Sequence, residues 1–156
     1  MPAEHGHIEQ ITPTLHDMDL QLQNRIVLVS GGAKGIGAGI TRAFAGEGAK
    51  VASVDIDTEA GEAIAAEGEG LAGEICFFDA DVSKGDVCQK LVADVLSAFG
   101  GSVDVLCNNV GIQPTDSYLP AHEYPDELWD RMIDVNLKSH FLMTKYCVPH
   151  MIEQGK

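Results

Sequence analysis

Basic residues are scarce in this sequence of 156 residues: 10 Lys and Arg stand against 24 Asp and Glu, a formal net charge of −14. A chain this acidic repels a phosphate backbone, so we expect no nucleic acid partner and no binding to an anionic membrane surface. Long apolar runs are also missing, and none approaches the roughly 18 residues of a membrane span. Because the first 24 residues lack the apolar segment of a signal peptide, we expect a cytoplasmic protein.

Metal and disulfide patterns are missing as well. The sequence has four cysteines, none of them in a Cys-x-x-Cys pair: Cys76, Cys88, Cys107 and Cys147. Each lies among apolar neighbours, so we expect reduced, buried thiols. His5 and His7 form a His-x-His in a polar amino-terminal stretch with no third ligand nearby, which favours a tail over a metal site.

After residue 24, short apolar runs alternate with amphipathic stretches. We expect strands over residues 25–30, 51–54, 74–78 and 103–107. We expect helices over residues 36–46, 58–67, 84–99 and 126–152, the last in one or two pieces. Asp57 or Thr58 can cap the second helix, Ser83 with Asp86 resembles a capping box for the third, and Pro149 should kink or end the fourth.

This alternation predicts an α/β fold with an open parallel sheet and helices on both faces. Right-handed crossovers then give the strand order 3-2-1-4, the doubly wound arrangement. A ligand is expected over the carboxyl ends of the strands, at the switch point between strands 1 and 4. We divide the chain into a polar extension, residues 1–24, and one domain, residues 25–156.

A glycine-rich turn follows the first expected strand. Residues 30–37 read SGGAKGIG and open the first expected helix. Glycines allow a sharp turn and a close approach to a pyrophosphate, whose charge is favourable at the amino end of a helix. The other phosphate-binding pattern, GxxxxGK(S/T), is absent, which counts against a P-loop nucleotide hydrolase. In this position the turn indicates a Rossmann-type dinucleotide site.

Asp55 stands at the end of the second expected strand, about 20 residues after the glycine loop, where a carboxylate can accept hydrogen bonds from ribose hydroxyls. Its charge would repel the 2′-phosphate of NADP. Lys34 in the loop acts weakly in the other direction, since a cation there could meet that phosphate. We therefore expect NAD as the cofactor, with NADP the less favoured alternative.

Four motifs occur in a characteristic order: the glycine loop with Ser30 in place of threonine, Asp55, Asp81-Val82, and residues 108–111, which read NNVG. Together they resemble the short-chain dehydrogenase/reductase family over residues 22–155. Val110 departs mildly from the alanine usual in that family. The resemblance implies a Rossmann fold and a nicotinamide dinucleotide cofactor.

The resemblance also implies roles for individual residues. It places around the pyrophosphate Gly31, Lys34, Gly35, Ile36 and Gly37. It places at the adenosine ribose Asp55 with Ile56, at the adenine Asp81 and Val82, and under the cofactor Asn108, Val110 and Gly111. Asn109 is expected to tie neighbouring strands through its amide. Asn136 resembles the catalytic asparagine that holds a water in a proton relay; the alternative is an asparagine exposed to solvent.

The family's chemistry also needs a serine and a tyrosine followed four residues later by lysine. None of Tyr118, Tyr124 and Tyr146 has a lysine at that spacing. The sequence therefore resembles the amino-terminal portion of such an enzyme, ending before those residues. We expect an oxidoreductase that transfers hydride between an alcohol or carbonyl substrate and NAD(H), homo-oligomeric in its complete form, with this chain as the cofactor-binding half. The alternatives are a non-catalytic dinucleotide-binding module and a non-functional truncated product.

Overall fold

The computed structural model describes residues 19–155. Four parallel strands form one sheet in the order β3-β2-β1-β4. They are β1 (Ile26–Ser30), β2 (Lys50–Asp55), β3 (Glu74–Asp79) and β4 (Val105–Asn108). The predicted fold class and strand order are therefore confirmed. β4 begins two residues later than expected, at Val105, after Asp104 donates its N–H to the Ile26 carbonyl at 2.7 Å.

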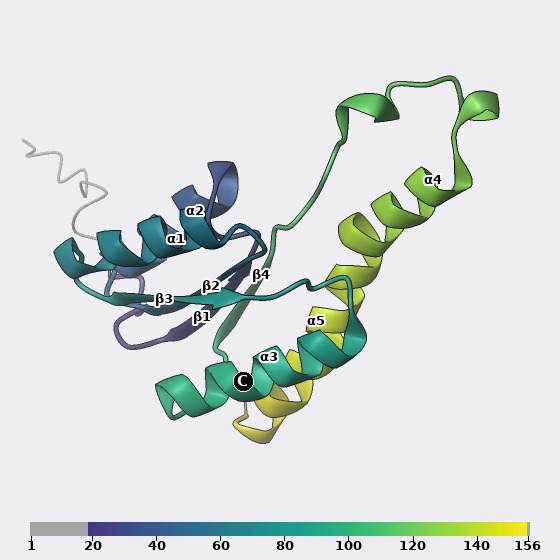
Figure 1. The fold of residues 1–156 in the computed structure, drawn as a ribbon. Coiled ribbons are helices and arrows are strands. Elements are labelled where there is room, and N and C mark those ends of the chain that lie inside the picture. The colour runs from purple at the N-terminus through teal and green to yellow at the C-terminus, as the bar shows by residue number, and fades with distance from the viewer. Residues whose placement is uncertain (1–18, 156) are drawn as a thin grey trace, which may run out of the picture.

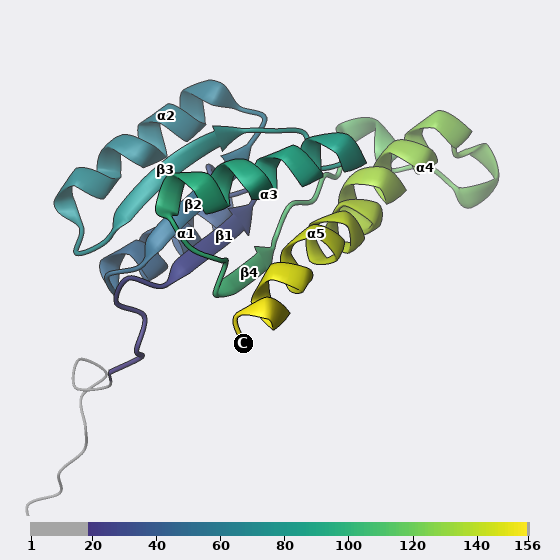
Figure 2. The same ribbon diagram turned by 90° about the horizontal axis from the view of Figure 1, so that it is seen from below.

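Helices cover both faces of the sheet (Figures 1 and 2). On one face lie α1 (Gly35–Gly46) and α2 (Thr58–Glu67), and on the other lie α3 (Gly85–Phe99) and α5 (Ser139–Glu153). α4 (Asp126–Ile133) runs into α5 through a π-helical segment, Asp134–Lys138. Figure 1 shows the chain after β4 leading away from the sheet and returning through α4.

Alternate residues of the central strand supply two separate cores. Ile26 and Leu28 pack with the side chains of α3 and α5, whereas Val27 and Val29 pack with those of α1 and α2. Because both faces are covered, β1 is apolar from Ile26 to Val29 rather than alternating, as expected for a buried parallel strand. This is why a short apolar run identified the strand from sequence.

The helix starts confirm one expected cap and correct another. Asp57 caps α2, its side chain accepting the Ala60 N–H at 3.0 Å. The expected cap at Ser83 is wrong: α3 begins at Gly85, and no side chain caps it. The reason is local competition, because the Asp81 carboxylate accepts both the N–H and the hydroxyl of Ser83, at 3.0 and 2.6 Å.

Pro149 does not end the last helix, which continues to Glu153. Proline removes one N–H and crowds the preceding turn, which normally breaks a helix. Here Leu142, Met143 and Cys147 are buried in the core shared with α3, so tertiary packing maintains the helix past the proline. Of the two alternatives for residues 126–152, one helix or two pieces, the structure shows two helices joined by the π-helical segment.

All four cysteines are free thiols, and Cys88 and Cys147 are buried. Burial raises the pKa of Cys88 to about 11 and that of Cys147 to about 12. Within residues 19–155 no helix is long and apolar enough to cross a membrane, and no cluster of metal-ligating side chains occurs. His5 and His7 lie outside the described residues.

Candidate functional site

A cavity of about 1000 Å³ lies over the carboxyl ends of the strands. Its lining comes from the segments that follow all four strands and from α4. A second cavity of about 620 Å³ lies at the opposite edge of the sheet, against Arg25, Lys50 and Asp104, where the strands begin. Because open parallel sheets bind ligands outside the carboxyl ends of the strands at the switch point, the larger cavity is the candidate site.

Most of the residues singled out in the sequence line this cavity: Gly31, Lys34, Ile36, Gly37, Asp55, Ile56, Asp81, Val82, Val110 and Gly111. Gly35, Asn108 and Asn136 are not part of the lining. Gly35 is exposed at the first position of α1, with open space where a side chain would begin. Asn136 bonds to the backbone of Ile112 in the lining, whereas the Asn108 side chain donates to His140 and Thr144 of α5, outside the lining.

The glycine turn fits a pyrophosphate. Gly31 and Gly35 have positive φ angles of 64° and 52°, which glycine adopts without strain. A Cβ on Gly37 would lie 1.8 Å from the Gly31 carbonyl oxygen, so only glycine lets α1 approach the turn this closely. No side chain caps α1 and its first turn holds no acidic residue, so its N-terminal N–H groups suit an anionic ligand.

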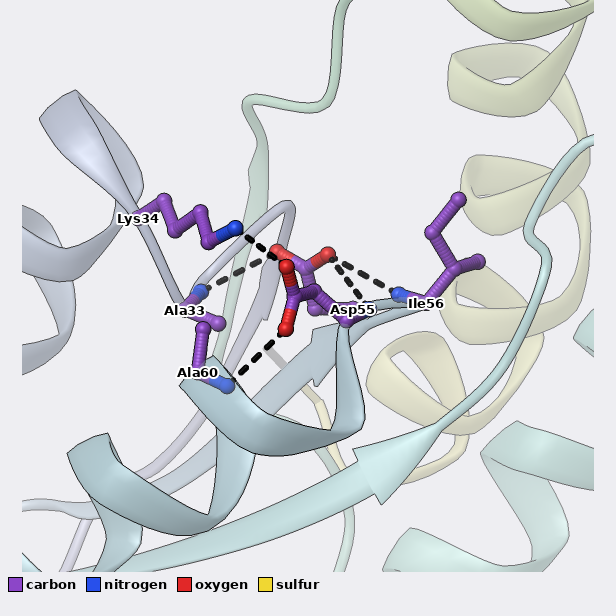
Figure 3. A network of polar contacts seen from close by, with 6 residues as sticks. Ala33, Lys34, Asp55, Ile56 and Ala60 are labelled. Atoms are coloured by element: carbon purple, nitrogen blue, oxygen red, sulfur yellow. Dashed lines mark hydrogen bonds and ion pairs between the residues drawn. The ribbon is translucent and has the colours of Figure 1, made fainter.

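Asp55 is fixed at the edge of the cavity by three backbone N–H groups (Figure 3). Its Oδ2 accepts the Ala33 N–H at 3.2 Å, and its Oδ1 accepts those of Ile56 at 2.9 Å and Asp57 at 3.2 Å. An ionised carboxylate has about four lone-pair sites, so it retains capacity for a ribose hydroxyl. The half-buried carboxylate therefore presents a negative charge in a defined orientation.

Lys34 forms an ion pair with Asp57 across the same edge of the cavity. The side-chain hydrogen bond between them raises the pKa of Lys34 and lowers the pKa of Asp57. Asp57 lines the cavity, a role that the sequence reasoning missed because it treated this residue only as a helix cap. The only signal was its position two residues after Asp55.

Asn109 connects the turn after β1 to the end of β4, as expected. Its side-chain amide donates to the Ser30 carbonyl at 3.1 Å and to the Gly31 carbonyl at 3.0 Å. In return, the Ser30 hydroxyl accepts the backbone N–H groups of Asn109 and Val110 at 3.1 and 3.3 Å. These bonds hold the two halves of the switch point together.

Asn136 lies in the π-helical segment and binds the backbone of Ile112 at both ends of its amide. Its Oδ1 accepts the Ile112 N–H at 2.7 Å, and its Nδ2 donates to the Ile112 carbonyl at 2.9 Å. The alternative of a solvent-exposed asparagine is therefore wrong. Single π-helical turns within α-helices occur frequently at functional sites.

Two further contacts join α5 to the end of β4 and to the segment that follows it. His140 Nε2 lies 3.0 Å from the Val110 carbonyl, and since a carbonyl only accepts, that nitrogen carries the proton. Asn108 Nδ2 donates to the Thr144 hydroxyl at 3.2 Å. Four residues rise about 6 Å in a helix and two rise about 6.6 Å in extended chain, so every fourth helical residue meets every second residue from the end of β4 onward.

α4 contributes side chains that the sequence reasoning did not assign to the site. Glu127, Asp130 and Arg131 of α4 line the cavity opposite the strand ends, and Asp134 at the start of the π-helical segment follows them at helical spacing. Ser83 and Lys84, before α3, also line it. The polar spacing was visible in the sequence, but which structure it faced depended on how the chain returns after β4.

The pattern that defines the short chain dehydrogenase family matches residues 25–156. D-threitol dehydrogenase of Mycolicibacterium smegmatis is 37% identical over 139 residues, covering 89% of this chain and 52% of that protein. The 3-oxoacyl-acyl-carrier-protein reductase FabG of Thermotoga maritima is 38% identical over 135 residues, covering 86% and 53%. The chain thus spans about half the length of the curated relatives it matches.

Solved structures of dehydrogenases and oxidoreductases have a similar fold. An NAD+-bound xylitol dehydrogenase superposes with a TM-score of 0.80 at 28% identity, covering 86% of this chain and 50% of that one. A metagenomic short-chain oxidoreductase in complex with NADP gives a TM-score of 0.80 at 33% identity, covering 85% and 59%. Fold, motif order and sequence identity lead to one conclusion: this chain belongs to the short-chain dehydrogenase family of oxidoreductases, whose members bind NAD or NADP.

Proposed function

We propose that this chain is the cofactor-binding half of an NAD-dependent oxidoreductase that transfers hydride between an alcohol or carbonyl substrate and NAD(H). When bound, the dinucleotide supplies the nicotinamide ring that accepts or donates the hydride. The chain's own part is to bind and orient that group over the carboxyl ends of β1 and β4. Because the chain spans about half of each relative, the reaction is a proposal for the whole protein.

The binding residues follow the geometry of the cavity. The glycine turn with Lys34 and Ile36 would hold the pyrophosphate at the start of α1, where a Cβ on Gly37 has no room. Asp55 and Ile56 would hold the adenosine ribose, and Asp81 with Val82 the adenine. The remaining proposed contacts lie beneath the nicotinamide half: Asn108, Val110 and Gly111.

Asp55 is the residue that supports a preference for NAD over NADP. Three backbone N–H groups fix its carboxylate at the cavity edge, so it cannot turn away from a ligand without losing them. A fixed carboxylate accepts hydrogen bonds from a ribose diol and repels a 2′-phosphate at the same place. The nucleotide without that phosphate is therefore favoured.

Calorimetric titration of the whole protein with NAD and with NADP tests this choice. We expect NAD to bind more tightly, and Asp55→Ala to lose most of that preference, about tenfold or more, with the charge-assisted hydrogen bonds. Asp79→Ala is the matched control, because Asp79 ends β3 beside Asp55 but does not line the cavity. Tighter binding of NADP by the unaltered chain contradicts the proposal, and binding of neither nucleotide contradicts a dinucleotide site.

Asn136 is proposed as the catalytic asparagine that holds a water in the proton relay. Its amide neither gives nor takes a proton near neutral pH, so it cannot replace the tyrosine and lysine of the family. Nicotinamide reduction by the whole protein with an alcohol substrate distinguishes an enzyme from a non-catalytic binding module. Loss of that turnover in a whole-protein Asn136→Ala variant that still binds NAD supports the relay role.

Three further expectations are also proposals. We propose that residues 1–24 are an extension of a domain that begins at residue 25, and that the protein acts in the cytoplasm. We propose a homo-oligomer, which is supported by large apolar side chains left exposed near the start of α5, Leu137 at 62% and Phe141 at 63%. Sedimentation of the whole protein tests this assembly.

A further inference from the structure

The charge at the adenosine edge of the cavity comes from three side chains close together. Lys34 is the cation of the glycine turn, and Asp55 and Asp57 are the two carboxylates that end and follow β2. Asp55 is directed by backbone N–H groups, whereas Asp57 pairs with the Lys34 ammonium. Figure 3 shows the Lys34 side chain extended toward the carboxylates rather than away into solvent.

Asp57 is held in place for this pairing. One of its carboxylate oxygens accepts the Ala60 N–H at 3.0 Å and caps α2, which leaves the other oxygen for Lys34. Its backbone N–H donates to Asp55 at 3.2 Å. The carboxylate is therefore anchored on the protein, and the flexible partner of the pair is the lysine.

An unpaired lysine in this turn would favour NADP. A lysine ammonium is a compact charge on a long stem, and a phosphate group beside it receives charge-assisted hydrogen bonds. With Asp57 paired to it, the three side chains together carry one negative charge. A 2′-phosphate entering this edge would have to compete with a fixed carboxylate for the same ammonium.

We propose that Asp57 is a specificity-determining residue: by binding Lys34 it prevents the loop lysine from serving a 2′-phosphate and keeps the site selective for NAD. This inference rests on the proposed function, since it assumes a dinucleotide at this edge. It assigns to Asp57 a task separate from that of Asp55. Asp55 binds the ribose and repels the phosphate directly, whereas Asp57 acts through Lys34.

Asp57→Asn isolates the charge. Asparagine caps a helix about as well as aspartate, so α2 keeps its start while the ion pair is lost. We expect the ratio of NADP to NAD affinity to rise about tenfold, measured by calorimetry on the whole protein. The same ratio between adenosine 2′,5′-bisphosphate and 5′-AMP should rise similarly, because these fragments differ only at the 2′ position.

Lys34→Met, alone and combined with Asp57→Asn in a double variant, tests whether Lys34 causes the gain in NADP binding. In the Asp57→Asn background, Lys34→Met should remove the gain in NADP binding. In the unaltered background it should change the ratio by less than about threefold, because Asp57 already occupies the lysine. Glu67→Gln is the matched control: it removes the same charge from the exposed ion pair between Arg42 of α1 and Glu67 of α2, which does not line the cavity.

The outcomes separate the inference from the proposed function. An unchanged ratio in Asp57→Asn, with α2 intact by circular dichroism, overturns the role of Asp57 while NAD binding still supports the site. The proposal is also overturned if Lys34→Met lowers NADP affinity as much in the unaltered protein as it does in the Asp57→Asn background. Lys34 would then reach the phosphate despite Asp57. If neither the dinucleotides nor the adenosine fragments bind, both proposals fail.

Discussion

Asn136 and Ile112, 24 residues apart in the chain, form two hydrogen bonds of 2.7 and 2.9 Å between the Asn136 side-chain amide and the backbone N–H and carbonyl of Ile112. Asn136 lies in the π-helical segment before α5, and Ile112 lies two residues beyond Val110 in the lining of the cavity. The contact thus fixes the segment after β4 against the helix. The effects of Asn136 on the site are therefore expected to be positional as well as chemical.

Replacing Asn136 by alanine should destabilise the chain by about 1–3 kcal/mol, because the Ile112 N–H and carbonyl lose their partners in a partly buried place. Urea denaturation measures the loss, and hydrogen exchange at the Ile112 amide should accelerate more than at the other amides of the cavity lining. The neighbouring exposed residue gives the control, since Gln113→Ala should change neither quantity. Unaltered protection of Ile112 in Asn136→Ala would show that the contact does not hold this segment.

Two glycines of α1 should respond to alanine in opposite directions. Gly37→Ala places a Cβ 1.8 Å from the Gly31 carbonyl oxygen, so we expect a loss of about 1–3 kcal/mol or more and weaker nucleotide binding. Gly39→Ala meets nothing within 4 Å and should stabilise the helix by about 0.5–1 kcal/mol. Urea midpoints of the two variants decide this, and equal shifts would contradict the close approach of α1 to the turn.

The pair of Lys34 and Asp57 should be visible in acid titration. The side-chain hydrogen bond from Lys34 lowers the pKa of Asp57 most, and the hydrogen bond that Asp57 accepts from the Ala60 N–H lowers it further. A carboxyl pKa that is lower in the folded state stabilises the fold above about pH 4, and this contribution is lost as the pH falls through the lowered value.

Lys34→Met should therefore raise the pKa of Asp57 toward its ordinary value, as followed by carbon NMR of the carboxyl group. The pKa of Glu67, which Arg42 lowers in a separate pair, serves as the internal control and should not move. A titration midpoint of Asp57 that is indifferent to the lysine would mean that the two charges do not interact in solution.

The buried thiols should resist modification until the chain unfolds. Burial raises the pKa of Cys88 to about 11 and that of Cys147 to about 12, so neither forms thiolate near neutral pH. At pH 8, iodoacetamide should label the half-buried Cys76 and Cys107 first, as read by peptide mass spectrometry. Early labelling of Cys147 in the folded chain would contradict its burial.

The raised pKa values of Cys88 and Cys147 also predict how stability depends on pH. Because they exceed the pKa of an unfolded cysteine, about 8.5, the free energy of unfolding should fall as the pH rises from about 9 toward 12.

Sequence patterns predicted the fold because the features concerned, a strand, a turn or a helix start, are each determined by residues close together in the chain. The apolar run of β1 predicted a strand buried on both faces, and the glycines after it predicted a sharp turn at the start of a helix. Asp55 was located for the same reason, since the end of a parallel strand and the edge of the sheet coincide. Given strand–helix alternation, the handedness of crossovers then leaves few arrangements of the sheet.

Local patterns failed where a competing contact was stronger than the propensity. Ser83 had the sequence context of a helix cap, yet its hydroxyl is engaged by Asp81 and the helix starts later. Pro149 was expected to kink or end the last helix, but α5 continues to Glu153, and Leu142, Met143 and Cys147 before the proline are buried in the core. The first outcome depends on a competing acceptor only two residues away, whereas the second depends on packing of α5 in the core shared with α3.

The partners of the site residues were decided only by the tertiary structure. Lys34 and Asp57 are 23 residues apart and lie on different elements, and Arg131 of α4 reaches the cavity only because the chain after β4 turns back toward the strand ends. Residue type and spacing determine which groups can carry charge or donate a hydrogen bond. Which of those groups meet depends on the packing of helices across the sheet, because a side-chain contact forms only over a few ångströms and the sequence does not state that distance.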